Sequence, residues 1–244
     1  MSRRTPSRDL TLQASMTLRT HVASPRDTKL EFLPIKSDPM LVLASASPRR
    51  QDLLRHAGIS FTVQPADIDE SPVVGESARE CAERLAREKA LAVWRTRSED
   101  VVLGADTIVV VDEANEIILG KPTDAEDAAR MLRLLSGRVH RVITGVCLIR
   151  AARGQRSGYS ASTLGIEGEV RTASETTFVT VIDLSDDEIR AYVASGEPMD
   201  KAGAYAIQGM ASRWIPRIEG DYSNVVGLPV PLVYRMLSGG RGQG

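Results

Sequence analysis

From residue 40 onward, short apolar runs alternate with segments of helical periodicity, and this alternation predicts a mixed α/β fold. Runs rich in Val, Leu and Ile are typical of buried strands. The predicted strands span residues 41–44, 61–63, 101–103, 108–111, 117–119, 142–149 and 177–182. Turn residues at 112–115 join two of these strands in a hairpin. We therefore expect one mixed sheet with flanking helices and no internal repeat.

Segments with apolar residues three or four positions apart predict amphipathic helices between the strands. Ser47 and Pro48 are a favourable N-cap and first helical residue, and Gly58 ends the same helix. The predicted helices cover about residues 47–58, 76–95, 124–135, 185–194 and 229–237. Residues 151–174 are rich in Gly, Ser, Thr and Arg, which indicates a long exposed excursion.

Residues 1–39 lack this periodicity and are rich in Arg, Ser, Thr and Pro, which indicates a mostly disordered extension before one domain at 40–244. Asp9, Asp27 and Glu31 argue against a transit peptide, because such peptides avoid acidic residues. The chain of 244 residues is 42% hydrophobic and 26% charged, which is enough for a sizeable buried core.

The formal net charge of −1 provides no overall field to attract DNA, RNA or an acidic membrane. Positive charge for a phosphate ligand must therefore be placed locally, and no apolar stretch reaches the roughly 18 residues of a membrane span. Cys81 and Cys147 are typical of reduced thiols in a cytosolic protein. The three histidines are scattered, so we expect any metal to have oxygen ligands, which favours Mg²⁺ or Mn²⁺.

Three charged residues occur where the local pattern favours apolar ones. Asp106 lies within the apolar run 101–111, where a carboxylate either faces a cleft or caps a turn between two strands. Lys89 falls on the apolar face of its helix, where it either reaches a site or extends past the edge of the core. Lys121 follows Gly120 in a tight turn that suits a bulky anion or a plain turn equally.

Residues 45–50, Ser-Ala-Ser-Pro-Arg-Arg, connect a predicted strand to a helix N-terminus, where free N–H groups and the helix dipole bind phosphate. Arg49 and Arg50 are opposed by that dipole, so they either face an anion or point to solvent. An acidic cluster after the second strand is either a solvated loop or a source of carboxylates for a divalent ion. The cluster consists of Asp67, Asp69 and Glu70.

Residues 196–209 place Asp200, Lys201 and Gln208 among small residues that suit a close-walled pocket, and an amide can read a pyrimidine edge. Carboxylates, cations and glycine-containing turns are together the equipment for phosphoanhydride chemistry, in which positioning and charge neutralisation dominate. The sequence has no Gly-x-Ser-x-Gly elbow for a nucleophilic triad.

The chain resembles the Maf family of nucleotide pyrophosphatases in several motifs that follow one another in the family's order over about residues 40–237. The matching motifs lie at 43–50, 104–107, 120–122, 135–137, 200–205 and 224–229. The resemblance implies an elongated mixed α/β fold, similar to inosine-triphosphate pyrophosphatases, with a central cleft between two lobes. It also implies hydrolysis of a nucleoside triphosphate to the monophosphate and pyrophosphate with a divalent cation, and a homodimer.

The resemblance assigns roles to individual residues. Asp106 matches the family's proton acceptor, which deprotonates the attacking water directly or through the metal, and Glu70 and Asp106 are the expected metal ligands. The other matching active-site groups are Lys89 and Lys121, which with Arg49 and Arg50 are expected to hold the triphosphate. The positions that match the family's specificity residues are Arg49, Thr107 and Gln208. Ser45 and Arg50 belong to the phosphate-binding signature.

The Asp-Lys-Ala-Gly-Ala-Tyr form of residues 200–205, with Ile-Gln-Gly at 207–209, resembles the branch that acts on dTTP and UTP. The alternatives are a pyrophosphatase for 7-methyl-GTP or modified nucleotides, a nucleotide-sensing inhibitor of septum formation, and an α/β domain whose polar residues are all structural. An intact set of the four matching active-site groups argues against a purely binding role.

Overall fold

The computed structural model describes residues 40–71, 73–111, 116–151 and 168–239. The strands are β1 (Leu41–Leu43), β2 (Thr62–Val63), β3 (Val101–Val111), β4 (Ile117–Leu119), β5 (Val139–Ala151), β6 (Gly168–Thr180) and β7 (Arg217–Glu219). They form one seven-stranded sheet in the order β2-β1-β3-β5-β6-β7, in which β4 also pairs with β3. The sheet is mixed, because β1 runs parallel to β3 whereas β5 runs antiparallel to it.

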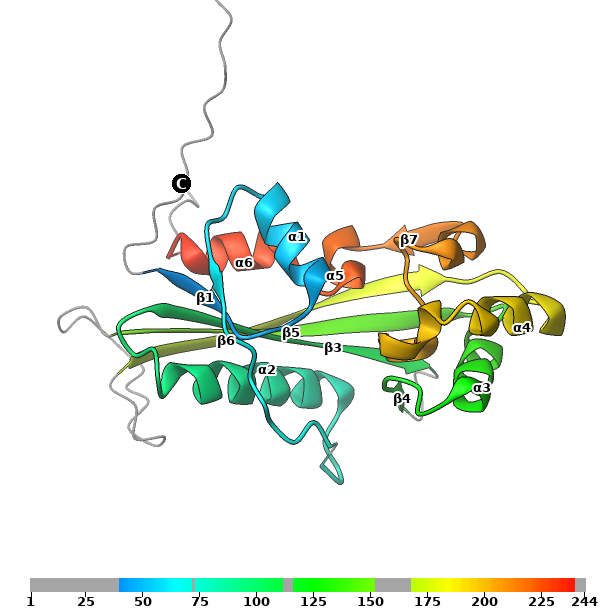
Figure 1. Cartoon of the computed structure of the whole chain (residues 1–244), viewed down its shortest axis with the longest axis horizontal. Helices are drawn as coiled ribbons and strands as arrows, with labels where there is room; N and C mark the ends of the chain where they lie inside the picture. The colour runs from blue at the N-terminus through cyan, green and yellow to red at the C-terminus, as the bar shows by residue number, and fades with distance from the viewer. Residues whose placement is uncertain (1–39, 72, 112–115, 152–167, 240–244) are drawn as a thin grey trace, which may run out of the picture. The chain divides into compact units, whose positions relative to one another are not determined.

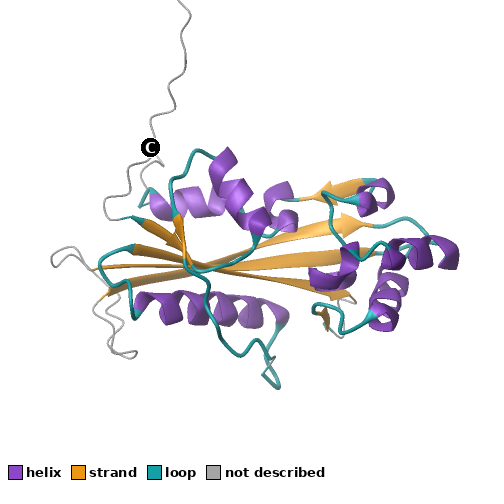
Figure 2. Ribbon diagram, viewed as in Figure 1, coloured by secondary structure: helices purple, strands orange, loops and turns teal. Residues whose placement is uncertain are grey.

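The helices flank both faces of the sheet. They are α1 (Pro48–His56), α2 (Ala78–Trp94), α3 (Ala125–Leu135), α4 (Asp186–Ala194), α5 (Tyr222–Val226) and α6 (Val230–Leu237). Figures 1 and 2 show α2 along one face and α1, α5 and α6 on the other. The predicted mixed α/β fold is confirmed. Within the described residues, no helix is both long enough and apolar enough to cross a membrane.

Two regions differ from the sequence prediction. Val101 to Val111 form one continuous strand rather than two, because β5 pairs with β3 across the polar residues in its middle. The predicted excursion at 151–174 is wrong from Gly168 onward, since these residues begin β6 and pair with β5. Residues 1–39, 112–115, 152–167 and 240–244 lie outside the described residues, so the predicted disordered extension stays a prediction.

Two glycines let α2 rest directly on the sheet. A Cβ atom at Gly104 of β3 would lie 2.1 Å from the carbonyl oxygen of Ala86, and one at Gly145 of β5 would lie 2.2 Å from that of Ala82. The helix backbone therefore packs against strand backbone with no side chain between them. This close approach places the buried face of α2, which is apolar except for Lys89, beside the middle of β3.

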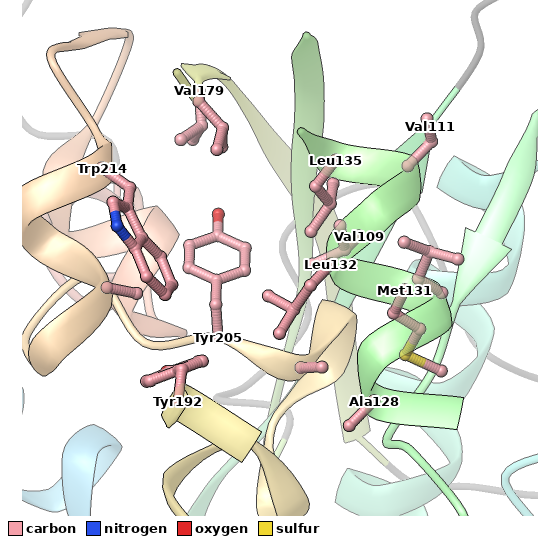
Figure 3. Packing of buried hydrophobic residues seen from close by; sticks show 14 of the residues in the cluster. Val109, Val111, Ala128, Met131, Leu132, Leu135, Val179, Tyr192, Tyr205 and Trp214 are labelled. Atoms are coloured by element: carbon pink, nitrogen blue, oxygen red, sulfur yellow. The ribbon is translucent and has the colours of Figure 1, made fainter. Parts of the chain in front are cut away.

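On the opposite face, a large apolar cluster covers the end of β3 (Figure 3). Leu132 and Leu135 of α3 pack there with Val109, beside the rings of Tyr205 and Trp214. The cluster holds a segment of short 3₁₀ turns over the sheet, so that its residues reach the edge of β3. The turns are η2 (Glu197–Asp200), η3 (Ala202–Ala204) and η4 (Met210–Trp214).

Candidate active site

A cavity of about 610 Å³ lies at a gap in the strand pairing along one edge of β3. On that edge β1 pairs only with Val101 to Leu103, and β4 pairs only with Val109 to Val111. In the described part of the chain, residues 104–108 have no strand partner on this edge. The cavity is lined by the loops after β1 and β2, by α2, by the middle of β3, and by β4 with the turn that follows it. Residues of the 3₁₀ segment and of the end of α5 complete the lining.

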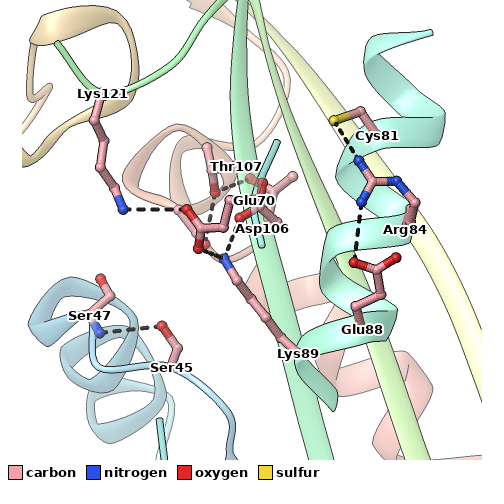
Figure 4. Close-up of polar contacts among 12 residues, drawn as sticks. Ser45, Ser47, Glu70, Cys81, Arg84, Glu88, Lys89, Asp106, Thr107 and Lys121 are labelled. Carbon is pink, nitrogen blue, oxygen red and sulfur yellow. Dashed lines mark hydrogen bonds and ion pairs between the residues drawn. The ribbon is translucent and has the colours of Figure 1, made fainter. Parts of the chain in front are cut away.

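Two lysines and two carboxylates meet in this cavity (Figure 4). The Nζ atom of Lys89 lies 2.5 Å from Oε1 of Glu70 and 2.6 Å from Oδ1 of Asp106. The Nζ atom of Lys121 lies 3.6 Å from Oε2 of Glu70. Lys89 and Asp106 are buried, whereas Glu70 and Lys121 are exposed. The cluster therefore has a desolvated inner pair and an outer pair that faces solvent.

The charges in this cluster stabilise one another. Two buried charges cost several kcal/mol unless they are paired, and Lys89 and Asp106 meet that condition. Partial burial raises the pKa of the Glu70 carboxyl, but the hydrogen bond and charge of Lys89, with the charge of Lys121, outweigh it. The pKa of Glu70 is therefore lowered, and this carboxyl stays ionised at neutral pH.

Arg49 and Arg50 differ in their exposure to solvent, because Arg49 is half-buried and Arg50 is buried. Arg50 is buried, which excludes the solvent-facing alternative for this residue, and burial lowers its pKa. Its guanidinium donates to the carbonyl of Gly227 at 2.7 Å, to Oγ of Ser45 at 3.1 Å and to Oγ1 of Thr107 at 3.0 Å. These bonds use three of the five N–H donors of an arginine. The side chain therefore fixes the loop after β1 against β3 and α5.

A second, smaller cavity of about 50 Å³ shares lining residues with the large one. Arg49 and Thr107 contribute to both cavities, whereas Gln208 lines only the small one. Side chains alternate along a strand, so Thr107 faces the small cavity while Asp106 faces α2. The aromatic residue Tyr205 also lines the small cavity.

The structure brings the predicted site residues together. Eight of them line the large cavity, namely Ser45, Arg49, Arg50, Glu70, Lys89, Asp106, Thr107 and Lys121. Of the acidic cluster, only Glu70 lines the large cavity. Asp67 and Asp69 lie outside the lining, and Oδ1 of Asp69 accepts a hydrogen bond from the Ser71 amide. The continuous strand also excludes a turn at Asp106.

Two polar residues that connect Thr107 to β5 and α5 were not among the predicted site residues. The hydroxyl oxygen of Thr107 lies 3.0 Å from that of Thr144 on β5. The Thr144 hydroxyl donates to the backbone carbonyl of Asn224 at 3.2 Å. Thr144 and Asn224 are completely buried. The signal was present, because Thr144 interrupts an apolar strand in the same way as Asp106 interrupts its own.

The carboxylates of Glu70 and Asp106 lie close enough together to contact one cation, which in this structure is the ammonium group of Lys89. Both accept from the same atom, Nζ of Lys89, so their oxygens already converge on one point. Among the described residues, no group of three or more His, Cys, Asp or Glu side chains forms a complete metal site. Mg²⁺ commonly needs only one or two carboxylates, with substrate phosphates and water completing its shell.

Known proteins resemble this chain over most of its length. The chain is 53% identical over 197 residues to the dTTP/UTP pyrophosphatase of Koribacter versatilis, covering 81% of this chain and 92% of that protein. It is 50% identical over 196 residues to the dTTP/UTP pyrophosphatase of Syntrophomonas wolfei, covering 80% and 95%. The family described as Maf-like protein matches residues 40–239, which include every residue that lines the two cavities. The chain therefore belongs to the Maf-like protein family.

Proposed function

We propose that the protein hydrolyses nucleoside triphosphates, dTTP and UTP among them, to the nucleoside monophosphate and pyrophosphate. The main support is the cluster of Glu70, Lys89, Asp106 and Lys121 in one cavity, which Arg50 also lines. Relatives that are about half identical over most of the chain carry the name dTTP/UTP pyrophosphatase.

In the proposed reaction Asp106 is the general base. Its Oδ1 accepts from Lys89, whereas none of the described residues hydrogen-bonds to Oδ2. Oδ2 takes a proton from a water molecule as the water oxygen bonds to the α-phosphorus. The bond from that phosphorus to the bridging oxygen of the β-phosphate breaks, and the electron pair leaves with pyrophosphate. The hydrogen bond from Lys89 to Oδ1 keeps Asp106 oriented for this transfer.

The cationic side chains of the cavity, Lys89 included, bind the phosphates. Arg49, Arg50, Lys89 and Lys121 line the large cavity together with three carboxylates, those of Glu70, Asp106 and Asp200. Four positive and three negative side chains leave a net charge of +1, which is too small to neutralise the negative charge of a triphosphate. A divalent cation, Mg²⁺ or Mn²⁺, held by Glu70 and Asp106 would supply the missing positive charge and polarise the attacked phosphoryl group.

We assign the base of the nucleotide to the small cavity. Gln208, Arg49 and Thr107 line it, and an amide beside a guanidinium offers both donors and an acceptor to a pyrimidine edge. This assignment also explains why Arg49 and Thr107, which border both cavities, lie between the base and the phosphates.

Pyrophosphate release from a panel of nucleotides tests reaction and substrate together. The panel contains dTTP, UTP, CTP, GTP and 7-methyl-GTP, each with Mg²⁺, with Mn²⁺ and with a chelator. We expect release from dTTP and UTP that requires the cation. Preference for 7-methyl-GTP would contradict the base assignment. Tight dTTP binding without any product would contradict hydrolysis and favour a nucleotide-sensing role.

The Asp106→Asn variant tests the role of the general base. We expect turnover to fall by about 100- to 10,000-fold in a protein that stays folded, because the amide retains the shape of the side chain. The melting temperature should fall, because Lys89 loses the charge of its buried partner. Near-normal pyrophosphate release by this variant would show that another group takes the proton.

We further propose that the protein is a cytoplasmic homodimer. Both cysteines are free and buried, which is consistent with a reducing compartment. The homodimer is proposed from the family resemblance, and light scattering of the purified protein measures its mass directly.

A further inference from the structure

Glu70 lies between the end of β2 at Val63 and the start of α2 at Ala78, where none of the described residues is in a helix or strand. Its side chain is about half exposed, yet Oε1 must stay near Lys89 for the cluster to form. An exposed carboxylate on such a loop has rotamer and backbone freedom that lowers its effective concentration at the site. Other contacts must therefore hold this loop.

Arg84 of α2 holds the loop at two places. Its Nε and Nη2 atoms donate to the two carboxylate oxygens of Glu76 at 2.8 and 2.9 Å. Nη2 also donates to the carbonyl oxygen of Ser71, the residue after Glu70, at 3.1 Å. Glu76 in turn accepts from the amide of Val73 at 3.3 Å. One guanidinium thereby ties both ends of the stretch that follows Glu70 to the helix.

The ion pair between Arg84 and Glu76 is shielded from solvent. The side chains of Arg84 and Glu76 are 18% and 10% exposed, so their bidentate pair is mostly shielded from water. The hydrogen bond to Arg84 holds the pKa of Glu76 below its usual value, so the pair stays charged at neutral pH. Arg84 lines neither of the two cavities.

We propose that Arg84 is a positioning residue that sets Glu70 for the reaction. Lys89 and Arg84 both belong to α2, as Figure 4 shows, so the same helix contacts the Glu70 carboxylate and fixes the backbone that carries it. This role rests on the proposed pyrophosphatase function, in which Glu70 is a working group of the site.

The first test compares Arg84→Lys with Arg79→Gln. Lysine keeps the charge at 84 but cannot form a fork to Glu76 and reach Ser71 as well. Arg79 lies on the same helix, and its hydrogen bonds go to Ser174 and Thr176 on β6, at 2.7 and 3.3 Å. We expect Arg84→Lys to lower kcat for dTTP about 10- to 100-fold with little change in KM, and Arg79→Gln to leave kcat unchanged.

A double-mutant cycle separates positioning from general damage. In a Glu70→Gln background, Arg84→Lys is expected to cause no further loss of kcat, because no carboxylate remains to be positioned. A purely structural role would give the same fold-change in both backgrounds. Equal losses, or an unchanged kcat in the single variant, would overturn the proposal.

Hydrogen exchange of the peptide covering residues 64–77 provides a measure that is independent of turnover. We expect its amides, including that of Val73, to exchange faster in Arg84→Lys than in Arg79→Gln or the unaltered protein. If the unaltered protein releases no pyrophosphate, the proposed function fails while the exchange data still test the clamp. Unchanged exchange in Arg84→Lys would contradict the proposal that Arg84 holds this loop, whatever the enzyme assay shows.

Discussion

The contact between α2 and β3 through Gly104 leads to a sharp prediction for Gly104→Ala. The added Cβ would lie 2.1 Å from the carbonyl oxygen of Ala86 and 2.7 Å from the amide nitrogen of Ala90. Both are backbone atoms of the helix, so no side-chain rotation relieves the clash. The helix must move away by roughly 1.5 Å to restore an ordinary van der Waals contact.

This movement affects both stability and activity. Overpacking of this kind costs about 1 to 3 kcal/mol of unfolding free energy. Lys89 precedes Ala90, and its 2.6 Å contact with Asp106 depends on the close approach of the helix. A displacement of this size at a catalytic contact lowers turnover by about 100-fold. We therefore expect a folded protein with a lower melting temperature and a large loss of kcat.

Urea unfolding and pyrophosphate release measure the two effects separately. The matched control is Val233→Ala in α6, which removes buried methyl groups from a cluster on the opposite face of the sheet and costs about 1 to 3 kcal/mol. We expect the control to retain kcat below its melting temperature. If Gly104→Ala folds and keeps the kcat of the unaltered protein, the close approach of α2 does not determine the Lys89–Asp106 geometry.

Three further predictions concern buried polar groups. Burial lowers the pKa of His140 from 6.5 to about 4, so only the unfolded chain gains this proton as the pH falls through that window. Stability then decreases by at most about 1.4 kcal/mol per pH unit, and His140→Gln should remove this slope from urea titrations. Burial raises the pKa of both Cys81 and Cys147 to about 11, so a thiol reagent at pH 8 should modify neither until urea is added. Arg50→Lys should lose about 1 to 3 kcal/mol in the same unfolding assay, because its buried acceptors lose their donors, whereas Arg49→Lys should change little.

The position of the secondary structure was largely predictable, because it depends on local signals. Ser77 caps α2 in a capping box with Glu80, and Gly137 adopts a positive φ at the end of α3. The errors arose where pairing overrides local preference. The polar middle of β3 and the start of β6 are strands because β5 provides a hydrogen-bonded partner for both.

The pattern of charges among apolar residues determined which positions were unusual, and Lys89, Lys121 and Asp106 were recognised without any contact being known. Whether each faced a ligand or solvent was decided by tertiary structure, since residues distant in sequence become neighbours only when the chain folds. Glu70 meets Lys89 because α2 rests on Gly104, and Arg84 reaches Ser71 because the loop turns back over the same helix. Local periodicity encodes which face of an element is buried, but only packing determines what lies opposite that face.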